Sequence, residues 1–180
     1  MTGVETVAKR RVRKAETGER EKGARESSTL QLRPARIPDA TQIVQLIARY
    51  ANRGMMLHRP YGEVLENIRD FVVAVDRGRV VGCGALHVVW DDVAEIRSLA
   101  VAEEYAGRGI GRAIVEALVV EAERLGLPRV FTLTYQQAFF EKLGFVVVDR
   151  ETLPHKFWKD CFKCVKFAYC DEVAMARELE

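Results

Sequence analysis

The feature that most constrains the fold is a glycine-containing turn between a strand and a long amphipathic helix. The strand pattern Glu95-Ile96-Arg97-Ser98-Leu99-Ala100-Val101 is followed, after a short loop, by Arg108-Gly109-Ile110-Gly111-Arg112. Apolar residues then recur at helical spacing from Ile110 to Leu125, and Gly126 stands where a helix C-cap is expected. A strand that leads through a turn into such a helix predicts an α/β chain.

The same turn predicts an anion-binding site. The first N–H groups of a helix have no intrahelical acceptor and lie at the positive end of its dipole, so they favour a phosphate or pyrophosphate. Gly109 and Gly111 let the backbone approach an anion without an intervening Cβ, and Arg108 and Arg112 add positive charge. The alternative is a helix cap without a ligand. A dinucleotide site is disfavoured, because its fingerprint needs a parallel strand–helix–strand unit.

The rest of the chain alternates between strand and helix patterns, with hairpin signals before the glycine turn. Strands are expected at residues 30–33, 71–76, 79–90, 93–101, 130–134 and 145–148 (the final one), and helices near 38–50, 61–70, 110–125 and before Leu143. This order predicts an α/β (α+β) fold whose mixed, mostly antiparallel sheet is flanked by helices. Strand alternation predicts that Glu95, Arg97, Leu99 and Val101 share one face.

The first residues differ in composition from the rest. Residues 1–28 are rich in Lys, Arg, Glu, Gly and Ser, so we expect a disordered basic tail before a domain at 29–180, whose segment from about 151 is rich in Cys and Lys. The chain carries a net charge of +2, and the basic excess lies in the tail, so the domain gives no argument for nucleic acid. The sequence contains neither a long apolar run nor a secretory signal, so we expect no membrane partner and a cytoplasmic location.

Two motifs resemble those of the GCN5-related N-acetyltransferase (GNAT) superfamily. The segment Ala106-Gly107-Arg108-Gly109-Ile110-Gly111 resembles its Gln/Arg-x-x-Gly-x-Gly/Ala signature, with Ala106 at the first position. The segment Phe139-Phe140-Glu141-Lys142-Leu143-Gly144-Phe145 resembles its Tyr-Glu-Lys-x-Gly-Phe signature, with Phe140 in place of the tyrosine. The resemblance covers about residues 30–150. It implies the GNAT fold, acetyl-CoA as cosubstrate, and a cofactor site made of Leu99, Ala100, Val101, Arg108, Gly109, Ile110, Gly111 and Arg112.

The resemblance also implies acid–base roles. An attacking ammonium must lose a proton before it becomes a nucleophile. Glu95 holds the position of the family's general base, although a salt bridge with Arg97 is the alternative. Since Phe140 cannot donate a proton, Tyr135 is the candidate general acid. Water could protonate the thiolate instead, and Tyr135 would then be a packed core residue.

A narrower resemblance concerns the acceptor. Residues 54–59, 81–87 and 95–101 resemble bacterial amino-acid N-acetyltransferases, the N-acetylglutamate synthases that begin arginine biosynthesis. The resemblance implies L-glutamate as substrate and a short, free-standing enzyme. Its substrate-binding residues would be Leu57, Arg59, Arg97 and Ser98, since guanidinium groups bind carboxylates through two hydrogen bonds.

Other functions remain open. Arg59 could be a solvated loop residue, and Tyr169-Cys170-Asp171 stands where long family members carry an Arg-x-Ser substrate element. The alternatives are a GNAT enzyme for another amine, such as a protein lysine, a polyamine or a drug, and a non-catalytic acetyl-CoA sensor. A monomer and a homodimer both remain open.

A compact cysteine cluster lies near the C-terminus. Cys161, Cys164 and Cys170, together with His155, could form a tetrahedral zinc site. We favour the alternative, in which the thiols pack as small hydrophobic groups and no metal binds.

Overall fold

The computed structural model describes residues 30–153, 161–164 and 167–180. The predicted tail therefore lies outside the described residues. The described elements are β1 (Gln31–Pro34), α1 (Ala40–Ala51), α2 (Tyr61–Glu66), β2 (Phe71–Asp76), β3 (Arg79–Val88), β4 (Val93–Val101), α3 (Ile110–Arg124), β5 (Arg129–Thr134), α4 (Gln137–Glu141), β6 (Val146–Val147) and β7 (Val173–Glu178), with 3-10 turns η1 (Ile37–Asp39), η2 (Ile68–Asp70), η3 (Glu103–Tyr105), η4 (Arg150–Thr152), η5 (Cys161–Lys163) and η6 (Phe167–Tyr169).

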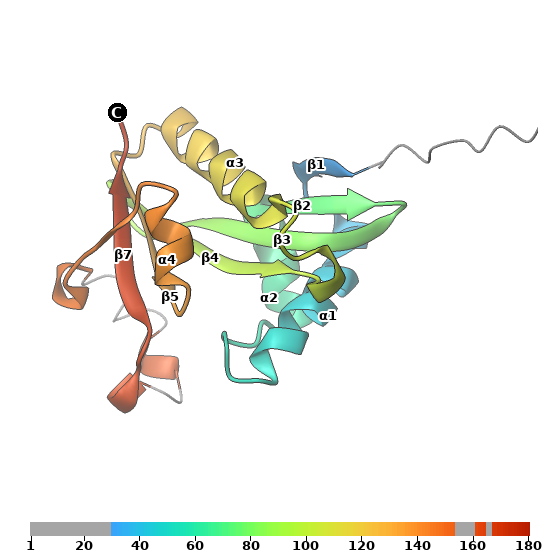
Figure 1. Ribbon diagram of the computed structural model, residues 1–180, viewed down its shortest axis with the longest axis horizontal. Helices are drawn as coiled ribbons and strands as arrows, with labels where there is room; N and C mark the ends of the chain where they lie inside the picture. The colour runs from blue at the N-terminus through green and yellow to red at the C-terminus, as the bar shows by residue number, and fades with distance from the viewer. Residues whose placement is uncertain (1–29, 154–160, 165–166) are drawn as a thin grey trace, which may run out of the picture.

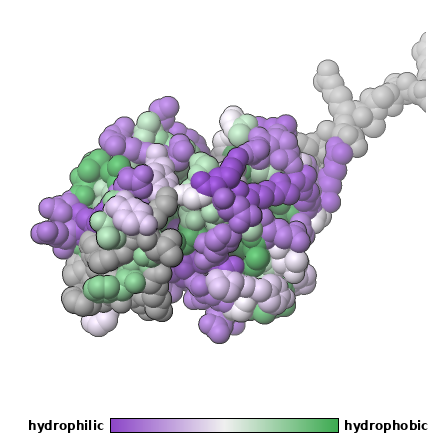
Figure 2. Space-filling view, turned by 90° about the horizontal axis from the view of Figure 1, so that it is seen from below, coloured by the Kyte–Doolittle hydropathy of each residue, from purple (hydrophilic) through white to green (hydrophobic). Residues whose placement is uncertain are grey.

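These elements form one seven-stranded sheet in the order β1-β2-β3-β4-β5-β7-β6, with α3 lying across it (Figure 1). Neighbouring strands are antiparallel except for β4 and β5, which are parallel. The prediction of a mixed, mostly antiparallel sheet flanked by helices is confirmed. The face seen in Figure 2 is largely hydrophilic, and hydrophobic residues are exposed there in smaller areas.

Three element boundaries differ from the prediction. The segment 145–148 is not the final strand, because β7 follows it and inserts between β5 and β6. The alternation in β7 is hard to recognise, since Ala174, Met175 and Ala176 are all buried. The helix expected at 61–70 divides into α2 and η2, and β3 ends at Val88 rather than Trp90.

Helix α3 lies very close to β3. A Cβ on Gly84 would stand 2.7 Å from Cγ2 of Ile114, and one on Gly82 would stand 2.9 Å from Cγ2 of Ile110. The buried face of α3 includes Ile110, Ile114 and Leu118, as the helical spacing predicts, whereas Leu125 is 55% exposed at the C-cap. This packing fixes the N-terminus of α3 beside the end of β4.

Strand β4 changes its alternation at Ser98. Ser98 has a left-handed backbone (φ 56°), and the β3–β4 register shifts between Cys83 and Ala85. Arg97 pairs with Ala85 of β3. Leu99 lies on the α3 face of the sheet, because its Cδ1 is 3.4 Å from where a Cβ on Gly84 would stand. The prediction of one shared face is therefore wrong: Glu95 and Arg97 face away from α3, and Leu99 and Val101 face toward it.

Candidate active site

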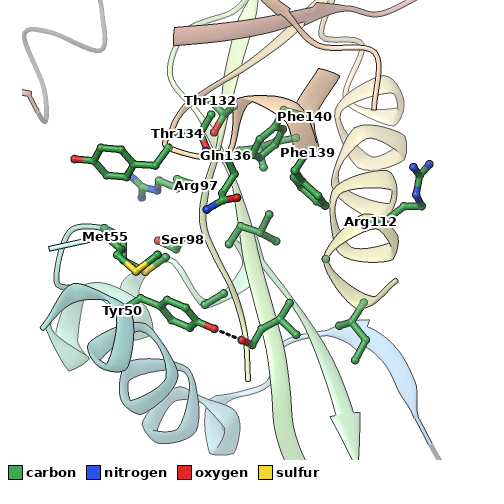
Figure 3. A pocket seen from close by; sticks show the side chains of 18 of the residues that line it. Tyr50, Met55, Arg97, Ser98, Arg112, Thr132, Thr134, Gln136, Phe139 and Phe140 are labelled. Atoms are coloured by element: carbon green, nitrogen blue, oxygen red, sulfur yellow. Dashed lines mark hydrogen bonds between the residues drawn. The ribbon is translucent and has the colours of Figure 1, made fainter. Parts of the chain in front are cut away.

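A cavity of about 570 Å³ opens where β4 and β5 separate. The two strands pair only over Val93–Glu95 and Arg129–Phe131. Beyond this point residues 96–101 of β4 and residues 132–136, which include the end of β5, form facing walls. Figure 3 shows Ser98, Thr134 and Gln136 around this space. The short parallel pairing therefore leaves a gap between the two strands.

The N-terminus of α3 forms one end of the cavity. Gly109, Ile110, Gly111 and Arg112 all line it. Gly109 is the N-cap in a left-handed conformation (φ 77°), and no side chain caps the helix. A non-glycine residue would be strained there. The first-turn N–H groups of this helix, which has 15 residues, suit a pyrophosphate.

The side chains of the two predicted arginines lie outside this cradle of N–H groups. The guanidinium of Arg108 stacks over the ring of Tyr105 at 4.8 Å. Arg112 pairs with Glu116 at 3.4 Å, and in Figure 3 it points away from the other labelled side chains. Both arginines are exposed, so they add a positive field at the rim.

The side of the cavity toward α1 is closed by Tyr50. Its hydroxyl donates a hydrogen bond to the carbonyl oxygen of Val101 (Figure 3). Burial, followed by the negative charge of Glu103, raises the pKa of the Tyr50 hydroxyl. Tyr50 therefore stays a neutral donor and holds the end of β4, next to Leu99 and Ala100 of the same wall.

Charged and polar groups gather at the other end of the cavity. Arg97, Ser98 and Tyr135 line it, and so does Glu172 from the segment before β7. The hydroxyl of Tyr135 donates to Oδ1 of Asp171 at 2.8 Å. Tyr135 could protonate a thiolate only if this hydrogen bond opened.

Arg150 holds the segment that carries Glu172. Its guanidinium donates to the backbone carbonyl oxygens of Cys170 and Glu172. The C-terminal segment therefore contributes to the site wall, although it lies far from β4 in sequence.

Glu95 lies next to the cavity and is not among the described residues that line it. It is 4% exposed and stands two positions before Arg97 on the same face of β4. Two strand residues span about 7 Å. A carboxylate set back from the cavity wall in this way would reach a substrate amine through water.

Leu57 and Arg59 also lie outside the described cavity wall. The side chain of Arg59 is 11% exposed, and its Nη1 donates to Oε1 of Glu63 at 2.5 Å. Its Nε is buried without a hydrogen-bond partner in the described part of the chain. Leu57 is 39% exposed.

Several cavity residues were not predicted as site residues, namely Tyr50, Met55, Met56, Thr132, Thr134, Gln136, Phe139 and Glu172. The sequence contains a signal for Tyr50, because this residue continues the apolar spacing of helix α1. It contains no such signal for Glu172, since the position of Glu172 depends on where β7 pairs.

The cysteine cluster shows no metal geometry in the described residues. Within 30–153, 161–164 and 167–180, no group of three His, Cys, Asp or Glu residues is placed to hold a metal ion. Cys161, Cys164 and Cys170 are half-buried and form no disulfide, and His155 lies outside the described residues. Among the described helices, none has the length and apolar character needed to cross a membrane.

Residues 40–145 match the acetyltransferase (GNAT) family, and the chain belongs to this family. It is 42% identical to an uncharacterized N-acetyltransferase of Chlorobaculum tepidum over 82% of this chain and 96% of that protein. It is also 42% identical to an amino-acid acetyltransferase of Mycobacterium tuberculosis, over 66% of this chain and 69% of that protein.

A solved structure is similar as well. N-acetylglutamate synthase from Neisseria gonorrhoeae, complexed with coenzyme A and N-acetyl-glutamate, superposes with a TM-score of 0.76 and 25% identity. The superposition covers 86% of this chain and 36% of that one.

Proposed function

We propose that this chain transfers the acetyl group of acetyl-CoA to the α-amine of L-glutamate, the first step of arginine biosynthesis. The observation that carries the proposal is the position of Arg97, which lines the same cavity as the N-terminus of α3 and Tyr135. The amino-acid acetyltransferase and the N-acetylglutamate synthase that the chain resembles support an amino-acid acceptor.

The cavity suits acetyl-CoA at its α3 end. Its pyrophosphate would accept hydrogen bonds from the backbone N–H groups of Ile110, Gly111 and Arg112. Its arm would lie along Leu99, Ala100 and Val101, toward the charged end of the cavity. When bound, the thioester supplies the acetyl group to be transferred.

The acceptor would bind at the charged end. Arg97 would hold a glutamate carboxylate through two charge-assisted hydrogen bonds, with Ser98 beside it. Arg59 is a second candidate anchor, but it would have to turn from Glu63 toward the cavity. We therefore favour Arg97 as the main contact.

Glu95 would act as the general base through a water molecule. It takes a proton from the substrate ammonium, and the free amine then attacks the carbonyl carbon of the thioester. The C–S bond breaks, and the departing thiolate takes a proton from Tyr135 or from water. A buried carboxylate on the same face as Arg97 fits this role better than it fits a sensor without catalysis.

One observation favours a second candidate function. Glu172 lines the same end of the cavity, and a carboxylate there would attract a second ammonium group. A polyamine or a lysine side chain would fit that charge, whereas the distal carboxylate of glutamate would be repelled by it.

Thiol release from acetyl-CoA distinguishes the two candidates. The assay is run with each of the twenty amino acids, with spermidine and with a lysine-containing peptide. Glutamate should give the highest kcat/KM. A preference for spermidine or the peptide would contradict the amino-acid assignment.

A further inference from the structure

We propose that His87, oriented by Asp70, relays the proton from Glu95 to solvent. The inference rests on the proposed function, because it takes Glu95 to be the general base. It assigns roles to two residues that the cavity itself does not include.

The first link is an oriented imidazole. Nδ1 of His87 lies 2.9 Å from Oδ2 of Asp70, at the end of η2. An ionised carboxylate can only accept a hydrogen bond, so Nδ1 carries the proton. The other ring nitrogen, Nε2, is then a lone-pair acceptor, and Asp70 stabilises the imidazolium that forms when Nε2 is protonated.

The second link is the pairing of β3 with β4. His87 stands directly opposite Glu95 in the antiparallel register. Residues directly opposite one another project from the same face, with Cβ atoms about 4.5–5.5 Å apart. The imidazole is therefore the cross-strand neighbour of the candidate base.

Toward β5, the described residues beside Glu95 form an apolar cluster. Glu95 pairs with Phe131 of β5, which is 1% exposed. Phe131 belongs to a hydrophobic cluster with Leu153, Ala174 and Ala176. A proton cannot leave through such a cluster, because it offers no acceptor.

Exposure increases from Glu95 toward the His87–Asp70 pair. Glu95 is 4% exposed, whereas the side chains of His87 and Asp70 are 16% and 27% exposed. A base this deeply buried must lose its proton in each turnover before it can act again. His87 offers an acceptor that is both adjacent to Glu95 and closer to solvent.

Each proton that leaves the substrate reaches solvent by way of Glu95 and His87. The substrate ammonium gives a proton, through water, to the Glu95 carboxylate. The resulting carboxylic acid passes it to Nε2 of neutral His87, and the imidazolium releases that Nε2 proton to solvent water while Nδ1 keeps its proton toward Asp70. Glu95 and His87 both return to their starting states, so no further reactant is needed.

The test uses three variants of the full chain with the amino acid that the wild type acetylates. His87→Ala should lower kcat by about 100-fold, the lower end of the range for removing a positioned proton-transfer group. KM for acetyl-CoA should stay unchanged. His87→Asn should behave in the same way with an unchanged Tm, because its amide can still donate to Asp70. Asp70→Asn should lower kcat less.

Added imidazole separates a relay from a structural role. The site of His87 is partly exposed, so imidazole should restore kcat of His87→Ala in a concentration-dependent way. Glu95→Gln should not respond to imidazole. His58→Ala, which changes an exposed histidine, is the matched control and should keep wild-type turnover.

The relay and the proposed function fail under different results. An active wild type with unaffected His87→Asn turnover would overturn the relay alone, and so would a loss in His87→Ala that imidazole leaves unchanged. A wild type that releases no thiol with any amine would overturn the proposed function and the relay together.

Discussion

The thiol of Cys83 donates to the carbonyl oxygen of Ser98 across a distance of 3.6 Å. This contact ties the centre of β3 to a residue of β4 whose backbone is left-handed. A non-glycine residue in that conformation persists only where surrounding contacts hold it. The contact therefore supports the point at which β4 turns Arg97 and Leu99 to opposite faces.

Cys83 is expected to be unreactive in the folded protein. Burial raises the pKa of its thiol to about 12 from a usual value of 9.0. At pH 8 the folded protein should then hold roughly 10³-fold less thiolate at this site than the unfolded chain, since each pKa unit is a factor of ten. Ellman's reagent on a Cys161→Ser, Cys164→Ser, Cys170→Ser variant, with and without denaturant, measures the difference. Equal labelling rates in both conditions would contradict the prediction.

Replacement of Glu95 by Gln is expected to lower kcat by about 10²–10⁴-fold, because the amide cannot accept the substrate proton. KM for acetyl-CoA should barely change, since the α3 cradle is a separate element. Steady-state kinetics at neutral pH test this. Glu123→Gln, on the exposed surface of α3, is the control. Near wild-type turnover in Glu95→Gln would remove Glu95 from the mechanism.

Arg97→Ala is expected to remove a carboxylate contact worth about 1.5–3 kcal/mol. The value of kcat/KM for glutamate should then fall by roughly 10–200-fold. Arg97→Lys should recover only part of the loss, because an ammonium lacks the planar fork. With spermidine as acceptor, Arg97→Ala should be neutral or favourable, since it removes a like charge.

Arg59→Ala serves as the comparison. If Arg59 mainly binds Glu63, this substitution should lower Tm and leave kcat/KM for glutamate nearly unchanged. A loss in kcat/KM as large as that of Arg97→Ala would instead make Arg59 a substrate anchor.

The Arg33–Asp39 pair predicts acid sensitivity. Nη1 and Nη2 of Arg33 donate to the Asp39 carboxylate at 2.6 and 2.9 Å, and this lowers the Asp39 pKa below its usual value of 3.8. A carboxylate with a lowered folded-state pKa stabilises the protein above the unfolded-state pKa. This contribution to stability is lost as the pH falls through the folded-state pKa of Asp39.

Asp39→Asn should therefore lower the free energy of unfolding at pH 7 by about 1.5–3 kcal/mol, the range for hydrogen bonds to charged groups. The difference from wild type should shrink below about pH 4. Urea unfolding between pH 3 and pH 7 measures both effects. A difference that stays constant across this range would show that the carboxylate charge does not contribute.

The sequence by itself determined the local elements. The glycine turn, the α3 spacing and the hairpin of β2 and β3 depend on residues close in the chain, and all three are present as predicted. The α3 end of the site follows from them, because Gly109 and Gly111 lie within the turn.

Only the tertiary structure decided which side chains share the cavity. The change of side-chain face after Ser98 arises from a shift in the pairing register between β3 and β4. The periodicity of the β4 sequence alone cannot reveal this shift. The position of Glu172 depends on β7 pairing with β5, and Arg59 lies outside the described cavity wall with Glu63 as its partner. Local pattern determines the type of an element, whereas register and partner choice depend on contacts between residues far apart in the chain.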